Sequence, residues 1–505
     1  MDNSFFTSLK QTTNFTETEN GAITHKSTLN KVFDMFAFGG AYRNRSDADV
    51  ITLFKDAYQE DATLALKCLF YLRDIHGGQG ERRFFRIAYK WLCDYDAAAA
   101  LRNLTQVSEY GRWDDLIYAT EGTKLQNDAL EIIKNQFKLD LDSKTPSLLA
   151  KWLPSENASS YITNKMGNLI RKFMNMTHKE YRQALSKLRT RINIVEKLMS
   201  ENRWDEIEFD KIPSRAGMIY KNAFARRDLI AQKYKEFIKD ENTTVNTKTL
   251  YPYDIAHKAF TEESIPLDNA ERIATNKYWE NLPNYYNGRE ENGLAIVDTS
   301  GSMWGKPLEA AISLGAYVAE KAHGPFANHF LTFSSAPDFC EFHGADIVDK
   351  FNRAFHENRN NWGSNTDLKA VFDLLLNIAK QDNVKKEDMP TRLYIFSDME
   401  FDGVVTFDGY SEERWGYSRG IESIDEAETL LEGIAKEWKK EGYNLPDVIF
   451  WNLDARQNNI PMLKGGRFGY VSGLSPVLIE QILSGVTGID LMLKKLNSER
   501  YEKIV

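Results

Sequence analysis

The C-terminal part of the chain alternates short apolar runs with longer amphipathic stretches from about residue 292. Near-continuous apolar runs are typical of strands that are buried on both faces, whereas apolar positions every three or four residues are typical of helices. This alternation predicts a mostly parallel, doubly wound sheet. Because crossovers between parallel strands are right-handed, the helices are expected on both faces of that sheet. The predicted strands span 294–298, 329–334, 393–398, 448–454 and 468–472, and the predicted helices span 307–322, 367–380, 423–441 and 476–485.

The preceding residues carry the helical spacing almost throughout. Successive helical stretches with short connectors predict an α-solenoid of antiparallel helix pairs, although no exact internal repeat is present. The predicted organisation is a polar N-terminal arm over 1–25, a helical repeat module over 26–285 and an α/β domain over 290–505. The helical stretches are Asp49–Asp74, Phe84–Cys93, Ala97–Gln106, Ala129–Phe137, Met166–Met174, Tyr181–Met199 and Phe224–Phe237.

The composition is that of a globular protein, because 42% of the 505 residues are hydrophobic and 27% are charged. No run approaches the roughly 18 apolar residues of a membrane-spanning helix, and the N-terminus lacks the pattern of a secretory signal. The three cysteines, Cys68, Cys93 and Cys340, are odd in number and show no metal-binding spacing. We therefore expect no membrane association, no cysteine-ligated metal, and a reducing compartment, the cytoplasm.

Charge is distributed unevenly along the chain. Residues 291–505 carry 22 basic and 33 acidic side chains, whereas residues 151–240 carry 19 basic and 11 acidic ones. Basic side chains on helices, interleaved with Tyr and Phe, are the ingredients of a surface that contacts RNA phosphates and stacks on bases. A solvated helix face is the alternative interpretation. The candidate RNA contacts are Arg171, Lys172, Lys187, Arg189, Arg191, Arg226 and Arg227.

Three oxygen-bearing side chains follow the apolar run Gly293–Val297, where a predicted strand turns into a helix. Asp298, Ser300 and Ser302 stand at alternate positions, and Gly301 lets the backbone bend between them. Ligands that offer only oxygen suit Mg²⁺ or Mn²⁺ better than Zn²⁺. A serine-rich turn without a metal is the alternative for this string alone.

The Asp-x-Ser-x-Ser string resembles the metal-ion-dependent adhesion site of von Willebrand factor A domains, which are Rossmann-like. That resemblance implies a Thr and an Asp from two later loops, and Thr366 and Asp398 stand in that order, the first before a helical stretch and the second after a strand-like run. Ligands at the C-terminal ends of several strands are what an open α/β sheet offers. The resemblance implies that the five side chains hold Mg²⁺ (or Mn²⁺) and that a protein partner donates an Asp or Glu to its open position.

Two further strings, Arg73–Arg83 (RDIHGGQGERR) and Glu109–Leu116 (EYGRWDDL), resemble the Ro ribonucleoprotein family. In that family a TROVE module of HEAT-like helical repeats precedes a von Willebrand factor A domain. Thr18–Ala22 and Lys151–Glu156 resemble an uncharacterised bacterial and phage branch allied to it. The resemblance implies a TROVE-like module that binds single-stranded or small structured RNA.

Two classes of function follow. The first is a non-catalytic RNA-binding scaffold whose metal site takes a partner's carboxylate. The alternative is a protein-only adaptor, or a phage virion or assembly component, that uses the same metal site for protein–protein binding. A hydrolase would need several carboxylates around its metal, and the eight histidines form no metal-spaced pair, so we expect no enzymatic activity.

Overall fold

The computed structural model describes the chain except for residues 1–12, 193–194, 228, 334–336, 357–365, 404–428, 464–466 and 484–487. By their contacts, the described residues fall into two units. The sheet unit comprises the described residues of Met1–Arg45, Tyr251–Ser264 and Asn284–Lys495. The helical unit comprises those of Ser46–Leu250, Ile265–Pro283 and Leu496–Val505.

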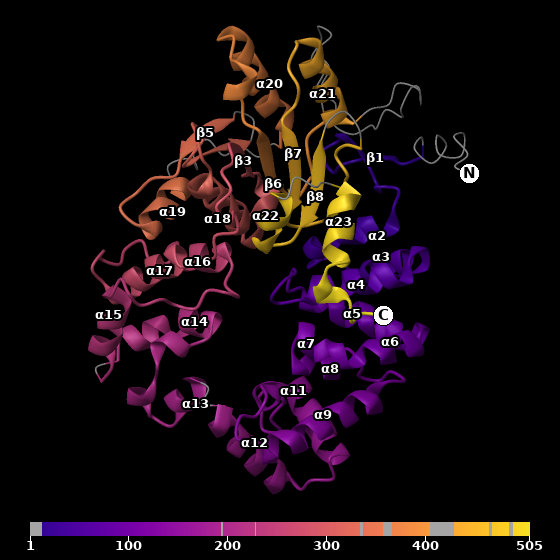
Figure 1. The fold of residues 1–505 in the computed structure, drawn as a ribbon, viewed down its shortest axis with the longest axis vertical. Coiled ribbons are helices and arrows are strands. Elements are labelled where there is room, and N and C mark those ends of the chain that lie inside the picture. Colours follow the sequence, from indigo (N-terminus) through magenta and orange to yellow (C-terminus); the bar gives the residue numbers. More distant parts are fainter. Residues whose placement is uncertain are drawn as a thin grey trace. The chain divides into compact units, whose positions relative to one another are not determined.

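The sheet unit is built on a six-stranded sheet with the strand order β5-β4-β3-β6-β7-β8 (Figure 1). β5 runs antiparallel to β4, and the other neighbouring pairs are parallel. A helical part followed by a mostly parallel sheet was predicted from the sequence, and it is confirmed. The strands are β3 (Gly293–Asp298), β4 (His329–Phe333), β5 (Asp338–Glu341), β6 (Arg392–Ser397), β7 (Asp447–Asn452) and β8 (Phe468–Ser472).

The central strands β3 and β6 are buried along their whole length, which accounts for their near-continuous apolar sequences. α18 packs against β3, β4 and β6. A Cβ on Gly315 of α18 would lie 2.5 Å from Val297 Cγ2, so this glycine allows the helix to lie close to the strand. The other helices of the unit are α2 (Lys31–Phe38), α16 (Pro252–Ala259), α19 (Ile347–His356), α20 (Leu368–Gln381), α21 (Leu430–Lys440), α22 (Val477–Ile482) and α23 (Gly488–Leu496), and α18 spans Lys306–Lys321.

The first described residues pack within the sheet unit. β1 (Phe15–Glu17) and β2 (Ile23–His25) form an antiparallel hairpin, and His25 exchanges backbone hydrogen bonds with Ile460. α2 packs against β8, where Gly40 N donates to Ser472 Oγ at 3.0 Å. These contacts group residues up to Arg45 with the sheet, whereas the sequence boundary between arm and helical module was predicted at residue 25.

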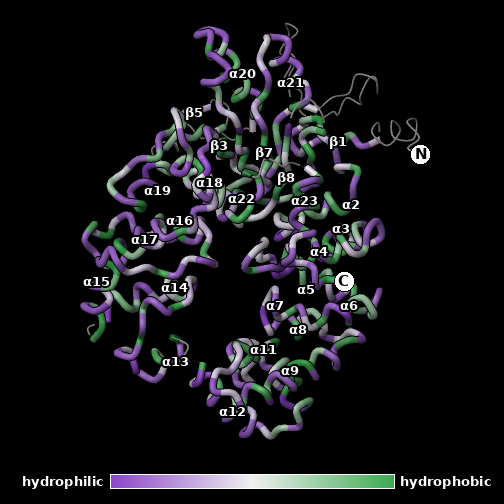
Figure 2. Tube along the Cα trace, viewed as in Figure 1, coloured by the Kyte–Doolittle hydropathy of each residue, from purple (hydrophilic) through white to green (hydrophobic). Residues whose placement is uncertain are grey.

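The helical unit consists of helices that pack mainly on their neighbours in the chain. α3 contacts α4 and α5, α8 contacts α9 and α10, and α14, α15 and α17 contact one another. Hydrophobic and hydrophilic residues interleave along these helices, as amphipathic helices require (Figure 2). The helices are α3 (Asp47–Glu60), α4 (Ala62–Arg73), α5 (Arg82–Tyr95), α6 (Ala97–Asn103), α7 (Val107–Tyr110), α8 (Trp113–Tyr118), α9 (Gln126–Asp142), α10 (Leu149–Trp152), α11 (Tyr161–Phe173), α12 (His178–Ile192), α13 (Val195–Ser200), α14 (Ser214–Ala225), α15 (Ala231–Lys239) and α17 (Ala270–Glu280).

None of the helices in the described parts of the chain has the length and apolar character that a bilayer crossing requires.

Candidate functional site

The order of the strands brings the ends of β3 and β6 side by side. β4 and β5 lie beyond β3, and β7 and β8 lie beyond β6, so the chain reverses its direction of travel between these two strands. In open α/β sheets, ligands bind outside the carboxyl ends of the strands at such a reversal. Asp298 is the last residue of β3, and Asp398 directly follows β6.

Asp298 is fully buried and held by its neighbours. Its Oδ1 accepts a hydrogen bond from the Ser300 amide at 2.9 Å, and its Oδ2 accepts one from Ser397 Oγ at 2.5 Å. Burial, followed by the nearby charge of Asp398, raises the pKa of the Asp298 carboxyl. A cation beside the two carboxylates would favour their charged forms.

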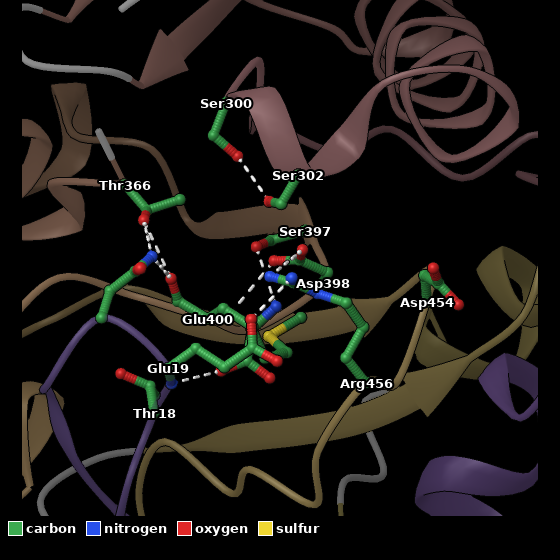
Figure 3. A network of polar contacts seen from close by, with 12 residues as sticks. Thr18, Glu19, Ser300, Ser302, Thr366, Ser397, Asp398, Glu400, Asp454 and Arg456 are labelled. Atoms are coloured by element: carbon green, nitrogen blue, oxygen red, sulfur yellow. Dashed lines mark hydrogen bonds and ion pairs between the residues drawn. The ribbon is translucent and has the colours of Figure 1, made fainter. Parts of the chain in front are cut away.

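Two hydroxyls contact this pair of carboxylates, Ser300 beside Asp298 and Ser302 beside Asp398; the two serines and Asp398 are drawn in Figure 3. Ser300 Oγ and Ser302 Oγ are 3.0 Å apart. Burial raises the pKa of the Asp398 carboxyl, although its contacts with Ser302 and Arg456 act in the opposite direction. We call Asp298, Ser300, Ser302 and Asp398 the oxygen cluster. The structure brings these four predicted ligands together.

Arg456 is the cation next to the oxygen cluster. Its Nη2 lies 3.2 Å from Asp398 Oδ2, and its Nη1 lies 2.6 Å from Glu19 Oε2 (Figure 3). Asp398 is 1% exposed, and its Oδ2 makes no hydrogen bond within the described part of the chain. Glu400 is also fully buried, and burial raises the pKa of its carboxyl. Among the described residues at this sheet edge, buried carboxylates therefore outnumber the cations that face them.

Thr366, the fifth predicted ligand, makes different contacts. Its hydroxyl accepts a hydrogen bond from Asn20 Nδ2 at 2.7 Å and lies 2.8 Å from the Glu400 carbonyl oxygen and 3.0 Å from Asp402 Oδ1. The Thr366 amide donates to Asp402 Oδ2 at 2.8 Å. In Figure 3 these contacts lie apart from the Ser300–Ser302 pair. The hydroxyl of Thr366 is thus hydrogen-bonded to the N-terminal hairpin and to the segment after β6.

The donors present suit a hard divalent cation. Two carboxylates and two hydroxyls at one sheet edge offer only oxygen. Asp398 Oδ2, which faces Arg456, is a buried acceptor that receives no hydrogen bond from the described residues. Among the described residues, no group of three or more His, Cys, Asp or Glu side chains is arranged to hold a metal ion. A metal in this position would therefore depend on the serine hydroxyls as well as on the carboxylates.

The predicted RNA contacts on α11 and α12 mostly face their own unit. Arg171 Nε lies 2.6 Å from Glu156 Oε1. The guanidinium of Arg189 donates to the carbonyls of Ala150 and Leu153 and to the Ser155 hydroxyl, at 2.8–2.9 Å. Arg191 donates to the carbonyl of Leu141 at the end of α9. These arginines tie neighbouring segments together.

The remaining candidates differ in their environment. Arg226 pairs with the buried Glu271, and the Arg227 guanidinium stacks over the Trp204 ring at 4.3 Å. Lys172 and Lys187 are exposed on α11 and α12.

A second basic group lies in the helical unit, among residues for which the sequence predicted no site. This group lies where the two segments that resemble the Ro family, Arg73–Arg83 and Glu109–Leu116, meet. The buried Arg73 of the first segment pairs with the buried Asp115 of the second at 2.6 Å. Arg86 contacts Asp114 and Asp115, and Arg112 contacts Asp114 and stacks over the Trp152 ring at 3.9 Å.

Arg82 begins α5 beside these residues. Although the residue is exposed, partial desolvation of its guanidinium, followed by the charges of Arg112 and Arg86, lowers the pKa of Arg82. We call Arg82, Arg86 and Arg112 the arginine cluster. The spacing of Arg82 and Arg86 on one helix was the signal in the sequence, but Arg112 joins them only through the fold.

Comparison with known proteins gives the following matches. The family model described as "Domain of unknown function (DUF2828)" matches residues 18–138 and 122–283, and the one described as "Domain of unknown function (DUF7788)" matches residues 292–503. The "Uncharacterized protein L728" of Acanthamoeba polyphaga mimivirus is 29% identical over 520 residues, which cover 93% of this chain and 85% of that protein. The crystal structure of the Deinococcus radiodurans RO (RSR) protein is similar with a TM-score of 0.49 at 14% identity, covering 91% of this chain and 100% of that one. Because the first of these models matches more than half of the residues, the chain belongs to the DUF2828 family.

Proposed function

We propose that this chain is a non-catalytic scaffold, in which the helical unit binds RNA and the oxygen cluster binds a divalent cation that recruits a protein partner. The observation that carries the proposal is the convergence of Asp298, Ser300, Ser302 and Asp398 at the carboxyl ends of β3 and β6. The resemblance of this string to the metal site of von Willebrand factor A domains supports the same assignment.

In this proposal the oxygen cluster holds Mg²⁺ or Mn²⁺, and the bound ion supplies a Lewis-acidic position for a carboxylate of the partner. Ser397 and the Ser300 amide orient the Asp298 carboxylate through their hydrogen bonds. Arg456 offsets the charge of Asp398 while the cation is absent. Thr366 would join the ligands only after its hydroxyl leaves Asn20.

The test is to measure Mn²⁺ binding to the full chain by calorimetry and by electron paramagnetic resonance. Asp298→Asn removes one anionic ligand and should weaken binding at least tenfold. Asp388→Asn is the matched control, because Asp388 is an exposed carboxylate of the same unit outside the cluster. Equal Mn²⁺ affinity of the Asp298 variant and the control would refute the metal assignment.

The arginine cluster supports the RNA half of the proposal. Arg82 lies near the guanidinium groups of Arg112 and Arg86, whose charges are offset in part by Asp114 and Asp115. A phosphate group would bring a further negative charge to the arginine cluster, and the Arg112–Trp152 stack offers a flat surface beside it. The exposed Lys172 and Lys187 could extend the contact.

A gel-shift titration with a small structured RNA over a range of salt concentrations tests this half. Loss of one phosphate contact in Arg82→Gln should reduce the slope of log affinity against log salt by about one. Lys90→Gln on the same helix is the control, because Lys90 is exposed near the opposite end of α5. A salt-independent affinity, or equal slopes for both variants, would contradict RNA binding at this cluster.

The alternative function is a protein-only adaptor or a phage virion or assembly component. It is favoured by the intramolecular partners of Arg171, Arg189 and Arg191, which leave less positive charge on α11 and α12 than the sequence suggested. Retention of Mn²⁺ binding by a protein that shifts no RNA would support this alternative.

A further inference from the structure

The tip of the N-terminal hairpin, Thr18–Gly21, contacts the segment that follows β6. Thr18 Oγ1 donates to the Phe401 carbonyl at 2.6 Å, and the Glu19 amide donates to Glu400 Oε2 at 2.8 Å. Gly403 N donates to the Asn20 carbonyl at 3.0 Å. The hairpin tip therefore lies beside Asp398, although more than 370 residues separate them in the chain.

Two further contacts of the hairpin tip lead to the predicted metal ligands Thr366 and Asp398. Asn20 Nδ2 donates to Thr366 Oγ1 at 2.7 Å and to the Glu400 carbonyl at 2.6 Å. Glu19 binds Arg456, whose other nitrogen faces Asp398 (Figure 3). Asn20 of the tip thus holds the hydroxyl of Thr366, and the preceding residue, Glu19, holds the guanidinium that faces Asp398.

The backbones of the two segments meet without space for another side chain. A Cβ on Gly403 would lie 2.7 Å from the Gly21 carbonyl oxygen. Gly21 itself has a φ of +86° and forms a bridge with Asp402. The return strand β2 is anchored farther on, because buried His25 contacts buried Glu432 at 3.3 Å. The base of the hairpin is therefore held through β2 by contacts that are separate from those of its tip.

We infer that the hairpin tip is an autoinhibitory strap that keeps Thr366 and Asp398 from a divalent cation. The inference rests on the proposed metal site and adds its regulation. In the strapped state the hydroxyl of Thr366 accepts from Asn20, and the guanidinium of Arg456 occupies the position beside Asp398. Binding of the ion to all five side chains requires Asn20 to release Thr366. A partner that pulls the hairpin tip away would therefore strengthen metal binding.

Two variants of the full chain loosen the strap from opposite sides. Asn20→Ala removes the amide that holds Thr366, and Gly403→Ala places a methyl group against the Gly21 carbonyl. Glu17→Ala is the control, because Glu17 is exposed on the same hairpin. The net value of a hydrogen bond predicts that Asn20→Ala binds Mn²⁺ roughly fivefold more tightly than the unaltered chain, and the control should not. Mn²⁺ should also accelerate hydrogen exchange at the Glu19 and Gly403 amides of the unaltered chain.

The outcomes separate the strap from the metal site. Tighter binding by both strap variants than by the unaltered chain supports the inference. Equal affinities in all four proteins, with unchanged exchange at Glu19 and Gly403, would overturn the strap and leave the metal site standing. Weaker binding by Asn20→Ala would overturn it as well, because the hairpin would then be part of the site. Absence of binding in every protein would overturn the proposed metal site and the strap with it.

Discussion

The Arg73–Asp115 pair gives the sharpest test of what holds the helical unit together. Asp115 is fully buried, and its carboxylate accepts from Arg73 Nε at 2.8 Å, from Arg86 Nε at 2.6 Å and from the Arg112 amide at 2.9 Å. Asp115→Asn keeps the shape of the side chain but leaves the guanidinium of Arg73, which is 2% exposed, without its counter-ion.

Removal of one partner from a buried ion pair costs about 3–5 kcal/mol in the free energy of unfolding. The matched control is Asp47→Asn, because Asp47 pairs with Arg83 while both side chains remain exposed, and such surface pairs contribute about 0–1 kcal/mol. Urea denaturation of the full chain, followed by circular dichroism at 222 nm (a standard helix signal), measures both values. A difference below about 1 kcal/mol between Asp115→Asn and Asp47→Asn would refute the claim that this pair stabilises the unit.

Two further predictions concern the sheet unit. Burial alone would raise the pKa of the Glu432 carboxyl, but hydrogen bonds with His25 and with the Leu463 and Thr429 amides lower it to about 2. Because this pKa in the folded chain lies below the ordinary value of 4.5, the ionised Glu432 stabilises the fold. That stabilisation is present above about pH 4.5 and is lost as the pH falls toward 2. Urea midpoints between pH 2 and 6 should therefore fall less steeply with acid in Glu432→Gln than in the unaltered chain, and identical slopes would contradict the assignment. Gly315→Ala should destabilise the unit by about 1–3 kcal/mol through overpacking against Val297, and Val297→Ala in the same chain should restore part of the loss; a stabilising effect of Gly315→Ala alone would contradict the close packing of α18 on β3.

Much of the sheet was predictable because strands that are buried on both faces have near-continuous apolar sequences. The predicted strand 294–298 corresponds to Gly293–Asp298, and the predicted helix 307–322 corresponds to Lys306–Lys321. β5 was missed, since this short edge strand has only one buried residue, Cys340. The stretch Asp49–Asp74 was predicted as one run, but Asp61 divides it by capping α4 through the Leu64 amide. The predicted helix 423–441 is described only from residue 429 onward.

The site was predictable to the extent that it depends on strand ends. Asp298 and Asp398 each end an apolar run, so their meeting follows from the parallel sheet. One partner of the Thr366 hydroxyl is Asn20, 346 residues away, and no local pattern in the sequence predicts that contact. The same holds for Arg189, whose acceptors are backbone carbonyls more than 30 residues upstream. The sequence shows that a basic side chain is present, but only the fold shows whether that side chain already has a partner within the same chain.

Anomalous diffraction from crystals of the full chain grown with Mn²⁺ shows whether the oxygen cluster holds a metal. We expect one manganese peak enclosed by Asp298, Ser300, Ser302 and Asp398, with Arg456 withdrawn from the Asp398 carboxylate. A map in which Arg456 still faces Asp398 and no manganese lies among these four side chains would contradict it.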